Sequence, residues 1–105
     1  MRSMERTAES LARTEAELRA EKAAALARIA GTLEGLLLDL RRRRETFGRL
    51  SSEERAPAAA AYDALWEQAR LYRWYLVVQR EALGLVRHDD IDRHYPPPEP
   101  LSTPR

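Results

Sequence analysis

One stretch of the chain places residues at alternating steps of three and four, and this heptad pattern constrains the fold more than any other feature. Because an α-helix turns once per about 3.6 residues, such steps keep side chains on one side of a helix. The members of this first stripe are Tyr62, Leu65, Ala69, Tyr72, Leu76, Gln79, Leu83 and Val86. The pattern predicts a long helix over about residues 57–87 that buries this side.

A second apolar set lies beside the first stripe on the same expected helix. Its members are Ala64, Leu71, Trp74, Tyr75, Val78, Ala82 and Leu85. At about 100° per residue, the two sets cover roughly 220° of the circumference, whereas a single core needs a stripe only a little over about 100° wide. This helix is therefore expected to contact more than one partner helix, as in a bundle or an oligomer.

An earlier apolar stripe predicts a first long helix over about residues 3–47. Its members fall within about 80° of one another on a helical wheel, and they are Met4, Leu11, Leu18, Ala25, Ile29, Leu33, Leu36, Leu40 and Phe47. Gly31 and Gly35 each cost up to about 1 kcal/mol relative to Ala, but the stripe keeps its phase across them. We therefore expect one continuous helix, and whether it bends at Gly31 and Gly35 stays open. The close approach of a neighbouring helix would explain why glycine occupies these two positions.

The connector between the two helices is expected at residues 48–57. Gly48 fits the position after a helix end, where glycine adopts a left-handed backbone at little cost. Ser51 and Glu54 have the spacing of a capping box, and Pro57 suits a first helical turn because its missing N–H is harmless there. The second helix is thus expected to begin between Ser52 and Pro57.

The helical pattern stops after residue 88, which divides the chain into a helical unit (1–88) and a C-terminal segment (89–105). Residues 89–94 have the composition of a polar turn or a short extra turn of helix. Four prolines within residues 96–100 are incompatible with a helix and favour a polyproline II conformation. Whether this proline-rich tail packs on the helices stays open.

The unequal lengths of the two expected helices indicate an oligomer. At 1.5 Å per residue the two helices span about 66 Å and about 46 Å, and a short connector makes them antiparallel. About 20 Å of the first helix would then extend past the end of the second helix and leave Met4 and Leu11 exposed to solvent. We therefore predict an all-α, long antiparallel hairpin with coiled-coil character that forms a homodimeric four-helix bundle, although other oligomers and a protein partner stay open. The residues expected in the core or oligomer stripe are Leu33, Leu36, Leu40, Tyr62, Leu65, Tyr72, Leu76 and Leu83.

Composition removes several classes of function. Ala, Glu, Lys, Leu and Arg make up well over half of the 105 residues, which is typical of long helices. The net charge of +1 provides no overall field that favours nucleic acid or an anionic membrane. The absence of cysteine excludes disulfides and thiolate chemistry. No signal peptide or membrane-spanning run is recognisable, so a cytoplasmic protein is expected.

A basic and aromatic face on the second helix is the first candidate binding site. Trp66, Arg70, Arg73 and Arg80 share an arc of about 80° on the wheel. Arginines interleaved with an aromatic ring can bind a single nucleic-acid strand, an acidic peptide or a phosphorylated ligand. The competing interpretation is a solvent-facing helix side whose arginines pair with nearby carboxylates.

Two further groups of residues have side chains that can bind a ligand. His88, Asp92 and His94 carry ligand types suited to zinc or manganese, but their spacing fits no known metal motif, and a helix terminus is the competing interpretation. The run Arg41–Arg44 can contact phosphate, but consecutive residues spread around a helix and cannot form one flat patch.

The sequence contains little that indicates an enzyme. No nucleophile–base pair and no glycine-rich phosphate loop can be named, so no catalytic residue and no cofactor is predicted. The sequence resembles no known family. The main hypothesis is a non-catalytic helical interaction or oligomerisation module. The alternatives are binding of nucleic acid or an anionic ligand, and a small helical-bundle enzyme or metal protein using the His88–His94 segment.

Overall fold

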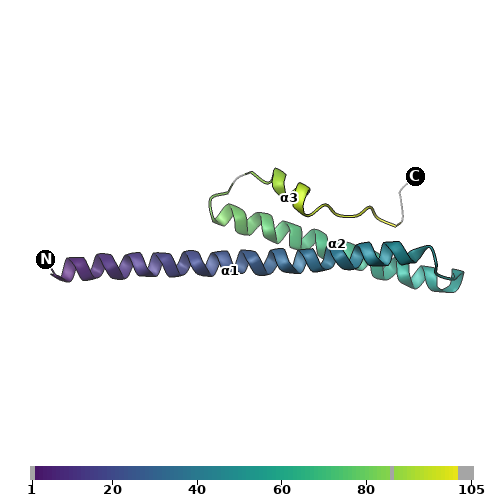
Figure 1. Cartoon of the computed structure of the whole chain (residues 1–105), viewed down its shortest axis with the longest axis horizontal. Helices are drawn as coiled ribbons and strands as arrows, with labels where there is room; N and C mark the ends of the chain where they lie inside the picture. The colour runs from purple at the N-terminus through teal and green to yellow at the C-terminus, as the bar shows by residue number, and fades with distance from the viewer. Residues whose placement is uncertain (1, 86, 102–105) are drawn as a thin grey trace.

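The computed structural model describes residues 2–85 and 87–101, which form three α-helices. These are α1 (Arg2–Phe47), α2 (Ser52–Ala82) and α3 (Asp89–His94), and the described residues contain no strand. The molecule is elongated, with extents of 77 × 22 × 16 Å, because α1 runs nearly its whole length (Figure 1). The all-helical fold class expected from the sequence is confirmed. Val86 and residues 102–105 lie outside the described residues.

α1 is one continuous helix through both of its glycines. A Cβ atom added at Gly31 or at Gly35 would meet nothing within 4 Å, and both residues are exposed. The expectation that a neighbouring helix approaches these glycines is therefore wrong. The glycines lie on the side of α1 that faces away from α2, where the absence of a side chain is not needed for packing.

Replacing both glycines by alanine is expected to stabilise the protein. Each substitution should raise the free energy of unfolding by up to about 1 kcal/mol, because alanine loses less backbone entropy in a helix and both sites have room for the methyl group. Urea denaturation of the Gly31→Ala/Gly35→Ala variant measures this. The matched control is Gly84→Ala, where φ is +86° and alanine should instead destabilise by about 1 kcal/mol or more.

The connector differs in detail from the sequence-based expectation. α1 ends at Phe47 in a turn closed by Arg49 N–H donating to the Thr46 carbonyl (3.0 Å), and Gly48 does not have a positive φ. Ser51 caps α2, since its hydroxyl accepts from the Glu54 N–H at 3.3 Å. Pro57 lies beyond the first turn expected for it, because α2 already begins at Ser52.

α2 ends at Ala82, about five residues earlier than the heptad pattern suggested. Gly84 adopts the left-handed conformation and donates to the Glu81 carbonyl (2.9 Å), while the Leu85 N–H donates to the Arg80 carbonyl (3.0 Å). This pair of bonds is the Schellman motif, which terminates a helix by satisfying its last carbonyls. The left-handed glycine predicted after the first helix is thus found after the second, and the chain turns back there.

The core lies between α1 and α2, which runs back along the C-terminal half of α1 (Figure 1). Of the predicted stripe, four side chains are buried, namely Leu33, Leu40, Tyr62 and Leu76. Three more are partly buried against them, namely Leu36, Leu65 and Tyr72. Leu83 is half-buried at the C-cap of α2. The core also contains Leu37, Ala69 and Ile91, and the last of these comes from α3.

The N-terminal part of α1 projects past the end of α2 (Figure 1). Every side chain from Ser3 to Glu21 is exposed, including the apolar Met4, Leu11 and Leu18. These leucines and the methionine recur at steps of seven, in phase with the part of α1 that contacts α2. We refer to residues 3–21 as the overhang of α1.

Candidate functional site

The third element of the structure is the C-terminal segment, which turns back after α2 and lies along it (Figure 1). α3 comes first, and the non-helical residues 96–100 continue toward the connector end of the two long helices. This segment covers the basic and aromatic face of α2. The candidate site is therefore a docking surface whose occupant is part of the same chain.

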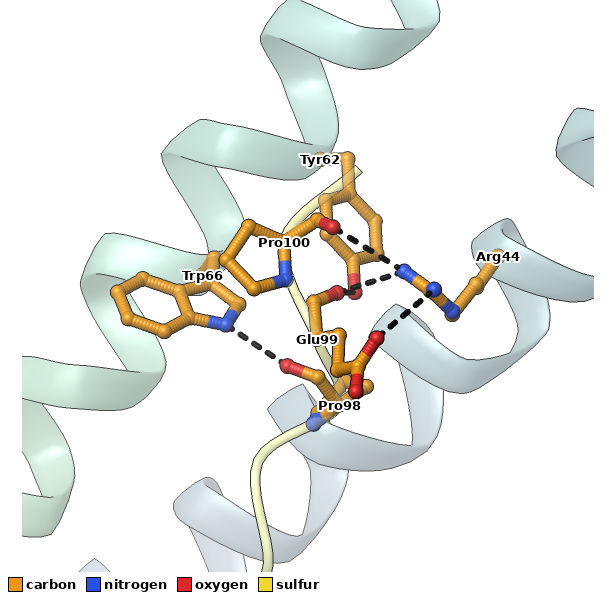
Figure 2. A network of polar contacts seen from close by, with 6 residues as sticks. All are labelled: Arg44, Tyr62, Trp66, Pro98, Glu99 and Pro100. Carbon is orange, nitrogen blue, oxygen red and sulfur yellow. Dashed lines mark hydrogen bonds and ion pairs between the residues drawn. The ribbon is translucent and has the colours of Figure 1, made fainter. Parts of the chain in front are cut away.

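Three side chains on the two long helices hold the proline-rich tail (Figure 2). The indole N–H of Trp66 donates to the Pro98 carbonyl at 2.9 Å. The Tyr62 hydroxyl and an Arg44 N–H both donate to the Glu99 carbonyl, each at 2.7 Å. We define Arg44, Tyr62 and Trp66 as the donor triad.

The donor triad continues onto a third carbonyl. Arg44 also lies 3.4 Å from the Pro100 carbonyl oxygen and 3.8 Å from the Glu99 carboxylate. The Arg44 guanidinium thereby contacts the end of the tail from α1, while Tyr62 and Trp66 donate to tail carbonyls from α2 (Figure 2). Three successive backbone carbonyls of the tail thus have donors, and most of the polar recognition is of backbone atoms.

Two ion pairs fix α3 on the same face of α2. Arg80 donates to the Asp90 carboxylate at 2.8 Å and to the Arg87 carbonyl at 3.1 Å, and Arg73 pairs with Asp92. Ile91 lies between these carboxylates in sequence, and its side chain is fully buried. α3 is thus attached by one apolar anchor and two charged pairs.

The predicted binding residues therefore have internal partners. Trp66, Arg73 and Arg80 all contact the C-terminal segment, whereas Arg70 is largely exposed and lies 3.8 Å from Glu67. The competing interpretation expected such arginines to pair with nearby carboxylates. Here two of them pair with carboxylates of α3.

Asp90 gives this contact a pH dependence. The hydrogen bond from Arg80 lowers the pKa of Asp90 below its ordinary value of 3.8. A lowered pKa means that the folded state favours the carboxylate, so its stabilising contribution is present above pH 3.8 and is lost as the pH falls through the folded-state pKa.

We expect acidic pH to weaken the contact between α3 and α2, because protonation of Asp90 removes the charge that pairs with Arg80. A carbon-13 NMR titration of the Asp90 carboxyl group should show a midpoint below 3.8 in the wild type. In an Arg80→Gln variant the midpoint should move up toward the ordinary range, because the charged donor is gone. An unchanged midpoint in that variant would contradict the assignment of Arg80 as the cause.

An apolar cavity of about 300 Å³ lies beside the tail, between the long helices and the C-terminal segment. Its apolar wall is formed by Leu33, Leu37, Trp66, Ala69, Tyr95 and Pro97, and Arg70 and Arg73 also border it. Burial raises the pKa of the Tyr95 hydroxyl, and the nearby Glu34 carboxylate adds to this. Tyr95 therefore keeps its proton above its ordinary pKa of 10.0 on the wall of this largely apolar space.

The three predicted metal ligands are not brought together. His88 contacts the Glu81 carboxylate through Nε2 at 3.2 Å, and Asp92 pairs with Arg73. Across residues 2–85 and 87–101, no group of three or more His, Cys, Asp or Glu side chains is placed to hold a metal ion. In the same part of the chain, no helix is long and apolar enough to cross a membrane.

The run Arg41–Arg44 is divided between different roles. Arg43 pairs with Asp39 one turn earlier at 3.2 Å, and Arg44 binds the tail. The spacing of the first helix puts Arg44 within its apolar stripe, where it is expected to snorkel or to pair with an acid, but the tail was not foreseen as its partner. Ile91 was also missed, although a single isoleucine among three aspartates is a signal that this turn has a buried side.

No known protein family, curated protein or solved structure matches the chain. The function must therefore be inferred from the surfaces of the protein itself.

Proposed function

We propose that the protein is a non-catalytic oligomerisation module that forms a homodimer through α2. The observation that carries this proposal is a second apolar stripe that remains exposed on α2. Leu71 is 45% exposed, Trp74 59%, Tyr75 37% and Val78 40%. We refer to this surface, together with Ala64 and Ala82, as the exposed seam; Leu85, the last member of the predicted second set, lies beyond the end of α2.

The three sides of α2 have different surroundings. One side packs on α1, and a second is covered by α3 and the tail. The exposed seam occupies the third side, and its members at 64, 71, 75, 78 and 82 recur at steps of 7, 4, 3 and 4. Such spacing is the pattern by which helices pair in coiled coils and bundles. This supports a further helix as the partner of the seam.

A second copy is the occupant that the charge and the aromatic content favour. The chain has a net charge of +1, so two copies repel each other little. Tyr75 contacts both Tyr72 and Trp74 through edge or tilted ring packing, which presents a preformed aromatic surface at the centre of the seam. Self-complementary surfaces of this kind close most often by a two-fold axis. Two chains paired in this way bring four long helices together.

Solution mass tests the proposal. Light scattering should give twice the chain mass of 12.1 kDa, and this mass should be the same at low and high salt because apolar burial is hardly screened. The Leu71→Asp/Val78→Asp variant should be a helical monomer. The matched control is Leu38→Asp, which changes an equally exposed leucine on α1 outside the seam and should remain a dimer. A wild-type protein that is monomeric at micromolar concentration would contradict the proposal.

A further inference from the structure

We propose that the groove between α1 and α2 is a binding site for proline-rich peptide segments, which residues 97–100 of the chain occupy in cis. The ligand would be an extended segment of a partner protein with prolines flanking an acidic residue. This inference goes beyond dimerisation and does not depend on it, because the groove and the exposed seam are different sides of α2.

The donor triad recognises the backbone of an extended segment. The bonds from Trp66, Tyr62 and Arg44 reach the carbonyl groups of residues 98, 99 and 100 in order (Figure 2). Proline has no N–H, so a proline-rich segment offers carbonyl acceptors without competing donors. Its fixed φ also lowers the entropy lost on binding, which is why aromatic-lined grooves bind such segments. The triad therefore has the chemistry of a site for proline-rich segments.

Side-chain recognition by the groove is weak at the position of Glu99. Its carboxylate lies 3.8 Å from Arg44, and the side chain is 83% exposed. An exposed ion pair of this geometry contributes little affinity. The groove therefore accepts segments of varied sequence, and an acidic residue between prolines adds only a little to the affinity.

The chain's own tail does not fill the groove. The cavity of about 300 Å³ between Leu33, Leu37 and Ala69 has the ring of Pro97 on its wall. A leucine at the position of Pro97 is longer and flexible enough to enter this space, and burying it would add affinity that the tail does not supply. The tail is thus an incomplete ligand, which a better-fitting segment can replace.

Replacement would leave the rest of the structure in place. α3 is attached separately, through Ile91 and the pairs of Asp90 and Asp92, so residues 96–101 can leave while α3 stays. A tethered tail competes at an effective concentration on the order of millimolar. A partner segment must therefore bind more tightly than the tail, and the tail acts as a built-in competitor against weak ligands.

The test measures binding of two labelled peptides to the full chain by fluorescence anisotropy. The first probe has the sequence of residues 95–101, and the second has leucine in place of Pro97. The tail-released variant is the full chain with Pro98→Gly and Pro100→Gly, which removes the stiffness of the tail but keeps its length. Circular dichroism establishes that each variant is folded.

We expect the tail-released variant to bind the first probe at least about tenfold more tightly than the wild type, because its internal competitor is weakened. The second probe should bind both proteins more tightly than the first. Adding Trp66→Phe, which keeps an aromatic ring but removes the indole donor, should weaken binding about fivefold or more, as loss of one hydrogen bond does. A probe with alanine for all prolines is the control and should not bind.

Several results would overturn the proposal. One is that the tail-released variant is folded but binds the first probe no more tightly than it binds the alanine control peptide. Should that variant fail to fold, the wild type decides the matter, since no binding of the second probe at millimolar concentration excludes the site. A dimer that falls to a monomer when probe is added would show the tail of a second copy in the groove, and tail exchange would replace the proposal.

The monomeric Leu71→Asp/Val78→Asp variant separates this inference from the proposed function. It should bind both probes as the wild type does, because neither substitution touches the donor triad. A variant that loses dimerisation and retains peptide binding would support both proposals, whereas a monomeric wild type that binds the probes would support the groove alone. Loss of peptide binding in a wild-type dimer would contradict the groove alone.

Discussion

Leu76→Asp is expected to unfold the protein, whereas Val78→Asp, two residues later, should leave each chain folded. Leu76 is 3% exposed in the core between α1 and α2, and Val78 is on the exposed seam. The first substitution removes a buried leucine, which costs about 2–5 kcal/mol, and also places an unpaired carboxylate in an apolar site. A total of about 4 kcal/mol or more approaches the whole stability of a small domain.

Circular dichroism and light scattering together distinguish the two outcomes. Leu76→Asp should lose most of its helical signal and its cooperative thermal transition. Val78→Asp should keep the helical signal and lose only the higher mass, if α2 is the dimer contact. A folded, helical Leu76→Asp protein would show that the contact between α1 and α2 does not hold the molecule together.

Ile91→Ala should release α3 without unfolding the long helices. Ile91 is fully buried, so removing its side chain costs about 2–5 kcal/mol. α3 has only six residues and one buried side chain, too few to survive that loss. Its ion pairs with Arg73 and Arg80 are partly exposed and cannot compensate.

Amide hydrogen exchange gives the readout for this prediction. The Tyr95 N–H, which donates to the Ile91 carbonyl at 2.8 Å, should lose its protection, while the amides in the middle of α2 keep theirs. Ile91→Val is the matched control and should cost only about 0.5–1.5 kcal/mol, with Tyr95 still protected. Equal loss of protection in α2 would mean that the C-terminal segment and the helices unfold as one unit.

Much of the helical plan could be predicted from the sequence because it depends on local periodicity. The first stripe places Tyr62 and Leu76 on one side of α2, and both are buried. The Ser51–Glu54 spacing likewise predicted the start of α2. These features involve neighbours on one helix, so the sequence spacing contains the information.

Features that depend on contacts between distant segments could not be predicted. Arg44 and the tail lie 55 residues apart, and no periodicity relates them. The arginines at 73 and 80 had the pattern of a ligand site, yet they contact carboxylates that follow α2 in sequence. The end of α2 was predicted too late because the heptad pattern continued past Gly84, whose left-handed backbone ends the helix.

The sequence by itself determined that this chain forms long helices, which residues face inward and that α2 has more apolar surface than one partner needs. It could do so because side chains three and four residues apart share a side of any helix. Only the tertiary structure decided how the sides of α2 are used. The reversal at Gly84 brings α3 and the tail onto the basic and aromatic side, where Ile91 and the donor triad hold them. Such pairing between distant segments depends on the direction of the turn and on side-chain geometry, which the spacing of residues does not specify.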